Sequence, residues 1–170
     1  MAVQELLRLG NPRLYKVCAP VGEHELHEMK QVVTDLHDTL MHFREEWGPA
    51  RAVAAPQIGV SKRLVYMFIN EPTVFINPVL GNFSTEMFEL WDDCMSFPEL
   101  LVRVQRHESC TVSYRDLEWN EHSVEFTSLS ELIQHECDHL DGILAISRAI
   151  DVRSIILKTE REYIAGASAN

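Results

Sequence analysis

The sequence has few basic residues. Its 170 residues include 15 Lys and Arg against 26 Asp and Glu, which gives a formal net charge of −11. A surface that binds nucleic acid or an anionic membrane needs clustered Lys and Arg. The deficit therefore argues against a direct nucleic-acid or membrane partner, and the excess of acidic residues is interpreted as a source of solubility.

Long hydrophobic runs are also missing. No apolar stretch approaches the ~18 residues that a membrane-spanning helix requires. Residues 1–6 lack the basic and apolar segments of a signal peptide. The sequence therefore predicts a cytoplasmic protein, and its length and 46% apolar content fit one domain with one core.

Cysteine is scarce and scattered. Cys18, Cys94, Cys110 and Cys137 lie far apart, with no Cys-x-x-Cys pair. In a cytoplasmic chain such cysteines are usually free thiols, metal ligands or nucleophiles rather than disulfides. Their spacing does not indicate which of them, if any, binds a metal.

Hydrophobic periodicity predicts helices among short strands. Apolar residues recur at three and four over residues 25–47, and Gly48-Pro49 ends that helix. A second helix follows Thr127 or Ser128 as N-cap, and a last one is predicted from about 151 to 163. Four runs rich in β-branched and aromatic residues predict strands, the first two as a hairpin: 63–69, 73–76, 101–106 and 110–115. With no linker or repeat, this pattern favours one α+β domain.

The second helix contains His135-Glu136-Cys137-Asp138-His139. Residues four apart share one face of a helix, so His135 and His139 can place two imidazoles on one divalent metal. Glu136 projects beside them, close enough to handle the proton of a metal-bound water. The motif predicts metal-assisted amide hydrolysis. The alternative is a chance match, at odds of roughly a few per cent.

One small, apolar segment, residues 50–59, carries a single polar amide, Gln57. It is a poor surface loop, so we expect it to line a core or a cleft. Judged from the residues alone, Gln57 is better interpreted as a satisfied core amide.

Three separated segments resemble the signatures of the peptide deformylase family. Residues 135–139 match its His-Glu-x-Asp-His completely, residues 92–96 correspond to Glu-Gly-Cys-x-Ser, and residues 50–57 to a glycine-rich stretch ending Ala-Ala-x-Gln. The resemblance extends from residue 7 to the last predicted helix. It implies an α+β fold with antiparallel sheets around a central helix carrying His-Glu-x-x-His, and a single catalytic domain over residues 1–170.

The resemblance also implies roles for individual residues. Cys94, His135 and His139 would hold one divalent metal ion with water in the fourth position. Fe²⁺ is expected, with Zn²⁺, Ni²⁺ or Co²⁺ able to replace it, although ligand types alone would suggest zinc. Glu136 would be the general base, while the Gln57 side chain and the backbone N–H of Met95 would form the oxyanion hole.

The implied reaction removes the N-formyl group from formyl-methionine at the start of new polypeptides and releases formate. The protein would then be a hydrolase of N-terminal processing in protein biosynthesis. Its partner would be an N-formylated peptide, including nascent chains at the ribosome, bound in an extended form by strand addition. A monomer is favoured over an oligomer.

The expected substrate pocket departs from the family pattern. It comprises Ala50, Ala52, Val53, Asp93 and Glu131. Ala50 and Ala52 replace glycines, and each adds a methyl group that narrows the cleft. Asp93 also replaces a glycine, and Asp tolerates a positive φ better than most residues.

Glu131 lies four residues before His135, where the family usually has an apolar residue. A carboxylate there would be desolvated beside a thioether and could instead bind a cationic or polar side chain. It could equally turn to solvent or pair with an arginine.

The departures leave two alternatives to the deformylase function: a deformylase-like amidase with altered substrate preference, and a non-catalytic metal- or peptide-binding homologue. Glu136 and Gln57 argue against the latter, because binding alone needs neither.

Overall fold

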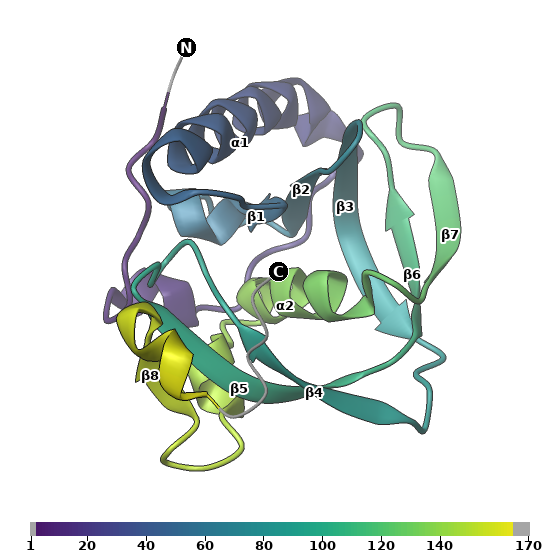
Figure 1. Cartoon of the computed structure of the whole chain (residues 1–170). Coiled ribbons are helices and arrows are strands. Elements are labelled where there is room, and N and C mark those ends of the chain that lie inside the picture. Colours follow the sequence, from purple (N-terminus) through teal and green to yellow (C-terminus); the bar gives the residue numbers. More distant parts are fainter. Residues whose placement is uncertain (1–2, 165–170) are drawn as a thin grey trace.

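Figure 1 shows the computed structural model of the chain, which describes residues 3–164. Two antiparallel sheets enclose one helix, α2 (Ser130–Leu140), which contacts strands of both. The larger sheet has the order β1 (Ala52–Ala54), β2 (Leu64–Phe68), β3 (Pro72–Gly81), β6 (Cys110–Arg115) and β7 (Glu121–Phe126). The smaller sheet has the order β4 (Met87–Asp92), β5 (Leu100–His107) and β8 (Ile155–Leu157). This architecture is the predicted α+β fold.

Helix α1 (Leu26–Trp47) covers the outer face of β1 and β2 (Figure 1). Its buried residues recur at helical spacing and join the core under the larger sheet. Gly48 ends the helix with a φ of +95°, a conformation that glycine adopts without strain. The prediction of a helix over residues 25–47 is confirmed.

The predicted hairpin is also present, since β2 pairs antiparallel with β3. The two later predicted strands exist as β5 and β6, but they belong to different sheets. β5 pairs with β4 and β8, whereas β6 pairs with β3 and β7. The short connection between them therefore carries the chain from the smaller sheet to the larger one.

Helix α2 begins one or two residues later than predicted. Its N-cap is Leu129, so the prediction of Thr127 or Ser128 was wrong. Leu129 packs against the core of the larger sheet, and the hydroxyl of Ser130 donates to the carbonyl of His107 at 3.0 Å. These tertiary contacts set where the helix starts, in place of a local side-chain cap.

The predicted last helix, from about 151 to 163, was also wrong. Residues 155–157 instead form β8 on the edge of β5, and a 3-10 helix follows over Lys158–Tyr163. The edge of β5 that β4 leaves unpaired explains the difference, because it offers backbone partners that a helix would not use. Arg103 of β5, for example, donates its N–H to the carbonyl of Ser154 at 2.8 Å. Within residues 3–164, no helix combines the length and apolar character needed to cross a membrane.

Candidate metal centre

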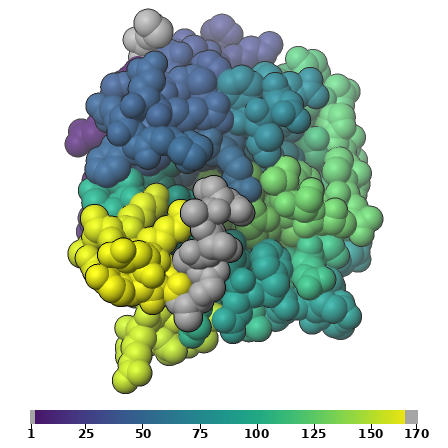
Figure 2. Space-filling model, viewed as in Figure 1, coloured from purple at the N-terminus to yellow at the C-terminus, as the bar shows by residue number. Residues whose placement is uncertain are grey.

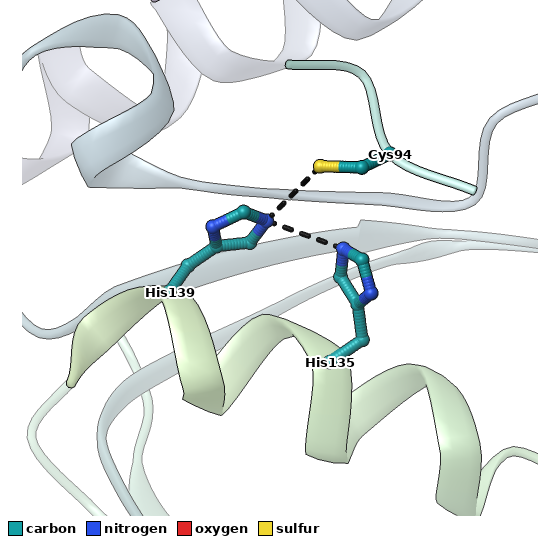
Figure 3. A group of neighbouring side chains, drawn as sticks. All are labelled: Cys94, His135 and His139. Carbon is teal, nitrogen blue, oxygen red and sulfur yellow. Dashed lines mark hydrogen bonds between the residues drawn. The ribbon is translucent and has the colours of Figure 1, made fainter. Parts of the chain in front are cut away.

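Three donor side chains converge between α2 and the loop that follows β4. Sγ of Cys94 lies 3.3 Å from Nε2 of His139, and that nitrogen lies 3.2 Å from Nε2 of His135. All three residues are buried, and their donor atoms lie within 4.8 Å of one another. Figure 3 shows both imidazoles rising from one side of α2 to meet the thiol from the facing loop.

The geometry selects one cysteine of the four. Within the described part of the chain, the ligand cluster contains Cys94 and no other cysteine. Cys137 lies in the same helix but belongs to the core of the larger sheet. Burial, reinforced by the nearby Glu136, raises the pKa of the Cys137 thiol far above its ordinary value, which disfavours the thiolate that a metal requires.

The donor set fits a divalent metal ion. With bonds of ~2.0–2.1 Å, a tetrahedral zinc ion separates two nitrogen ligands by about 3.3 Å, close to the observed 3.2 Å between the imidazoles. Burial, together with the neighbouring His135, lowers the pKa of His139 well below its ordinary value, which favours the neutral ring that binds metals. One thiolate and two imidazoles leave a fourth position open, as in catalytic sites.

Asp92, at the end of β4, orients His135. Nδ1 of His135 donates to Oδ2 of Asp92 at 2.9 Å, which directs Nε2 toward the cluster. Burial opposes both charges, but the attraction between the two groups outweighs it. The pKa of His135 is therefore raised well above its ordinary value, so a metal ion has to displace the proton from its Nε2, and the pKa of Asp92, which also pairs with Arg106, is lowered to about 2. The sequence alone does not predict this role of Asp92, for which its position two residues before Cys94 is the available signal.

A network of ion pairs continues from Asp92 into α2, and it is largely buried except at Arg148. Arg106 donates to Asp92 at 3.1 Å and to Asp138 at 2.5 Å. Arg148 donates to both oxygens of Asp138, at 2.6 and 2.5 Å. The two carboxylates are thus matched by two guanidinium groups, and the motif helix is tied to β4 and β5. No pattern in the sequence predicts these roles of Arg106, Asp138 and Arg148.

Glu136 lies beside the cluster with an unused oxygen. The residue is buried, and its Oε2 has no hydrogen-bond partner among residues 3–164. Burial raises the pKa of Glu136 to about 7. A carboxylate that can exchange a proton near neutral pH is suited to general acid–base chemistry.

Gln57 is held with its amide nitrogen toward the same centre. Its Oε1 accepts the N–H of Ala54 at 2.9 Å, while its Nε2 donates to Sγ of Cys94 at 3.6 Å and to Oγ of Ser96 at 3.2 Å. Gln57 is therefore a satisfied core amide, as its residue type suggested, and it also lies at the site.

A pocket opens beside the cluster. Its lining includes four of the five residues expected there and the proposed catalytic residues: Ala50, Ala52, Asp93, Glu131, Gln57, Met95 and Glu136. Val53 was expected in the pocket but does not line it. Successive side chains of a strand point to opposite faces, and the Val53 side chain is fully buried against the α1 side of the sheet.

Two ion pairs line this pocket. Nη1 of Arg51 lies 2.9 Å from Oε1 of Glu131, and Nζ of Lys158 lies 2.8 Å from Oδ2 of Asp93. Asp93 does not have a positive φ, so its replacement of a glycine does not strain the backbone.

Figure 2 shows the blue segment that contains α1 beside the yellow end of the described chain, although they are far apart in the sequence.

The sequence profile of the polypeptide deformylase family matches residues 3–154. This chain belongs to the polypeptide deformylase family. Peptide deformylase 1 of Prochlorococcus marinus is 35% identical to it, over 95% of this chain and 88% of the relative. The peptide deformylase of Parafrankia sp. is 38% identical, over 87% of this chain and 79% of the relative.

Solved deformylase structures share the fold. The crystal structure of peptide deformylase from Thermotoga maritima matches with a TM-score of 0.81 and 28% identity, covering 89% of this chain and all of that one (100%). A Met-Ala-Ser-bound class I type b peptide deformylase from Acinetobacter baumannii matches with a TM-score of 0.79 and 29% identity, over 87% of this chain and 99% of that one. The resemblance found in the sequence is thereby confirmed, and the chain is a metal-dependent hydrolase of the deformylase family.

Proposed function

We propose that this chain removes the N-formyl group from formyl-methionine at the start of new polypeptides and releases formate. The observation that carries the proposal is the Cys94, His135 and His139 cluster, which adjoins a pocket where Glu136 has an unused carboxylate oxygen. The related enzyme from Acinetobacter baumannii supports a peptide ligand, since it binds Met-Ala-Ser, a peptide that starts with methionine.

Cys94, His135 and His139 would hold one divalent ion, for which we expect Fe²⁺, with Zn²⁺, Ni²⁺ or Co²⁺ as replacements. Such an ion acidifies bound water and polarises a carbonyl oxygen. Asp92 keeps the imidazole of His135 directed at the cluster through the 2.9 Å contact to its Nδ1.

Side-chain and backbone groups of the protein would then transfer the proton and stabilise the negative charge that develops on the formyl oxygen. Glu136 takes a proton from the water that attacks the formyl carbon, and passes a proton to the amine as the C–N bond breaks. Burial, which raises the pKa of Glu136, makes its carboxylate a better proton acceptor. The amide nitrogen of Gln57 and the backbone N–H of Met95 donate to the oxygen that becomes negative.

The peptide would lie extended along the first two signature segments, with Ala50, Ala52, Asp93 and Glu131 around its first side chain. We further propose that residues 1–170 form a single catalytic domain, which acts as a monomer in the cytoplasm on nascent chains at the ribosome. Size-exclusion chromatography with light scattering tests the monomer.

The direct test is formate release from formyl-Met-Ala-Ser by protein purified and loaded with Fe²⁺ without oxygen. Glu136→Gln is the matched control, because it removes the proton acceptor while keeping the size of the side chain. We expect formate from the parent protein and almost none from the variant at equal metal content. A pure, fully metal-loaded protein that releases no formate from any formyl peptide would refute the proposal. Peptide binding that survives Glu136→Gln without any turnover would then support a non-catalytic homologue.

A second candidate function, a deformylase with an altered side-chain preference, is favoured by one observation. The pocket beside the metal ligands contains an Arg51–Glu131 ion pair where the family usually has an apolar residue.

A further inference from the structure

The pocket beside the metal cluster has a charged wall built from two elements. Glu131 lies one helical turn before His135, on the side of α2 that bears the metal ligands. Arg51 stands between Ala50 and Ala52, which both line the pocket. The two charged groups meet at 2.9 Å.

This pair differs from an ordinary surface ion pair. The Glu131 side chain is only 14% exposed, whereas that of Arg51 is 48% exposed. A mostly buried carboxylate needs a partner, and Arg51 supplies it at the pocket wall. The guanidinium has five N–H donors, and the carboxylate can accept several hydrogen bonds, so both groups retain capacity toward a ligand.

The charges around the pocket balance in pairs. Arg51 is matched by Glu131, and Lys158 is matched by Asp93 at 2.8 Å. A cationic side chain entering the pocket would compete with Arg51 for Glu131, and an anionic one would compete with Glu131 for Arg51. An apolar side chain would remove water from the pair without replacing its hydrogen bonds. None of these three classes suits the wall well.

A primary amide suits it better. Its carbonyl oxygen can accept from Arg51 while its NH₂ group donates to Glu131, and it brings no net charge. The thioether of methionine is a weak acceptor and can use only the Arg51 side. A purely aliphatic chain of the same length can use neither group.

We propose that the Arg51–Glu131 pair determines the specificity of this enzyme for the residue that carries the formyl group, favouring a primary-amide side chain over an apolar one of similar length. This inference rests on the proposed deformylase function and specifies its substrate class. The expected order is formyl-Gln, then formyl-Met, then formyl-norleucine. Hydrogen bonds to charged groups at a partly exposed wall give an expected advantage in kcat/KM of about tenfold between the first and the last.

The test compares formyl-Gln-Ala-Ser, formyl-Met-Ala-Ser and formyl-norleucine-Ala-Ser on metal-loaded protein. The decisive variant is the double substitution Arg51→Met with Glu131→Leu, which leaves no charge unpaired. We expect it to reverse the order, so that the formyl-norleucine peptide becomes the better substrate. The matched control is Arg115→Met with Glu121→Leu, which removes another Arg–Glu pair, located on β6 and β7 outside this pocket, and should leave the order unchanged.

A second readout separates this inference from the proposed function. Calorimetry with the unformylated peptides Gln-Ala-Ser and norleucine-Ala-Ser measures the side-chain preference without turnover. If no formyl peptide releases formate, the proposed function fails, yet the affinity ratio still tests the pair. A parent protein that prefers norleucine to glutamine in both assays would overturn the inference. So would a preference for glutamine that survives the double substitution.

Discussion

Asp92→Asn is expected to weaken metal binding without unfolding the protein. In the parent protein, Nδ1 of His135 lies 2.9 Å from the Asp92 carboxylate. The substitution keeps the size of the side chain and one oxygen near this nitrogen, but it removes the negative charge. A carboxylate behind a metal-binding imidazole fixes the ring and makes it a better ligand. Losing such a partner typically reduces metal affinity about 10–100-fold, or roughly 1.4–2.7 kcal/mol.

The fold should survive because Arg106 keeps a second partner. Arg106 is buried, and a buried guanidinium without a carboxylate would be strongly destabilising. It also donates to Asp138 at 2.5 Å, and that contact does not involve Asp92. The loss should therefore appear in metal affinity more than in thermal stability.

The assay is a competition for Zn²⁺ between the protein and a chromophoric chelator of known affinity, with circular dichroism to confirm folding. Asp93→Asn is the matched control, since it removes the same charge from the adjacent residue. Its partner Lys158 lies 2.8 Å away and is partly exposed, so we expect less than about a twofold change in affinity. Asp92 does not strengthen metal binding if the Asp92→Asn variant binds Zn²⁺ as tightly as the parent protein, or if Asp93→Asn lowers the Zn²⁺ affinity by the same factor.

Three further predictions concern the catalytic base, the third metal ligand and the end of α2. Glu136→Gln should lower kcat for formate release about 10²–10⁴-fold at unchanged metal content, measured together by formate assay and elemental analysis. Cys94→Ser should lose most of the bound metal, whereas Cys137→Ala should retain it; equal metal content in the two variants would contradict the ligand assignment. Gly142→Ala should lower the free energy of unfolding by about 1–3 kcal/mol in urea titrations, because φ is +71° and a Cβ would lie 2.6 Å from the Tyr15 backbone. Gly48→Ala, at φ +95° in open space, should show only the smaller backbone effect of about 1 kcal/mol.

The predictable features are those that depend on neighbours within a few residues. The i, i+4 spacing of His135 and His139 is sufficient to place two imidazoles on one face of α2. The apolar period of α1 and the β-branched and aromatic residues of β2 and β3 likewise predict their elements. Here local preference and tertiary structure agree.

The errors occur where distant segments compete with local preference. Residues 155–157 became a strand because the edge of β5 was available to them. The start of α2 moved to Ser130 because Leu129 packs into the core. Val53 is a different case, because the alternation of side chains along a strand, a local property, turns it toward the α1 side of the sheet.

Local sequence alone therefore determined the helix that carries the ligands, the two histidines on it and the acid between them. Local sequence did not indicate which cysteine completes the cluster; the family resemblance implied Cys94, and the tertiary structure brings it there. Only the tertiary structure decided which carboxylate orients His135 and whether Glu131 pairs with a cationic side chain. Cys94, Asp92 and Arg51 reach α2 from strands or loops tens of residues away in the chain. Their distances from the helix depend on how the two sheets pack around it, and no periodicity in a short segment encodes that.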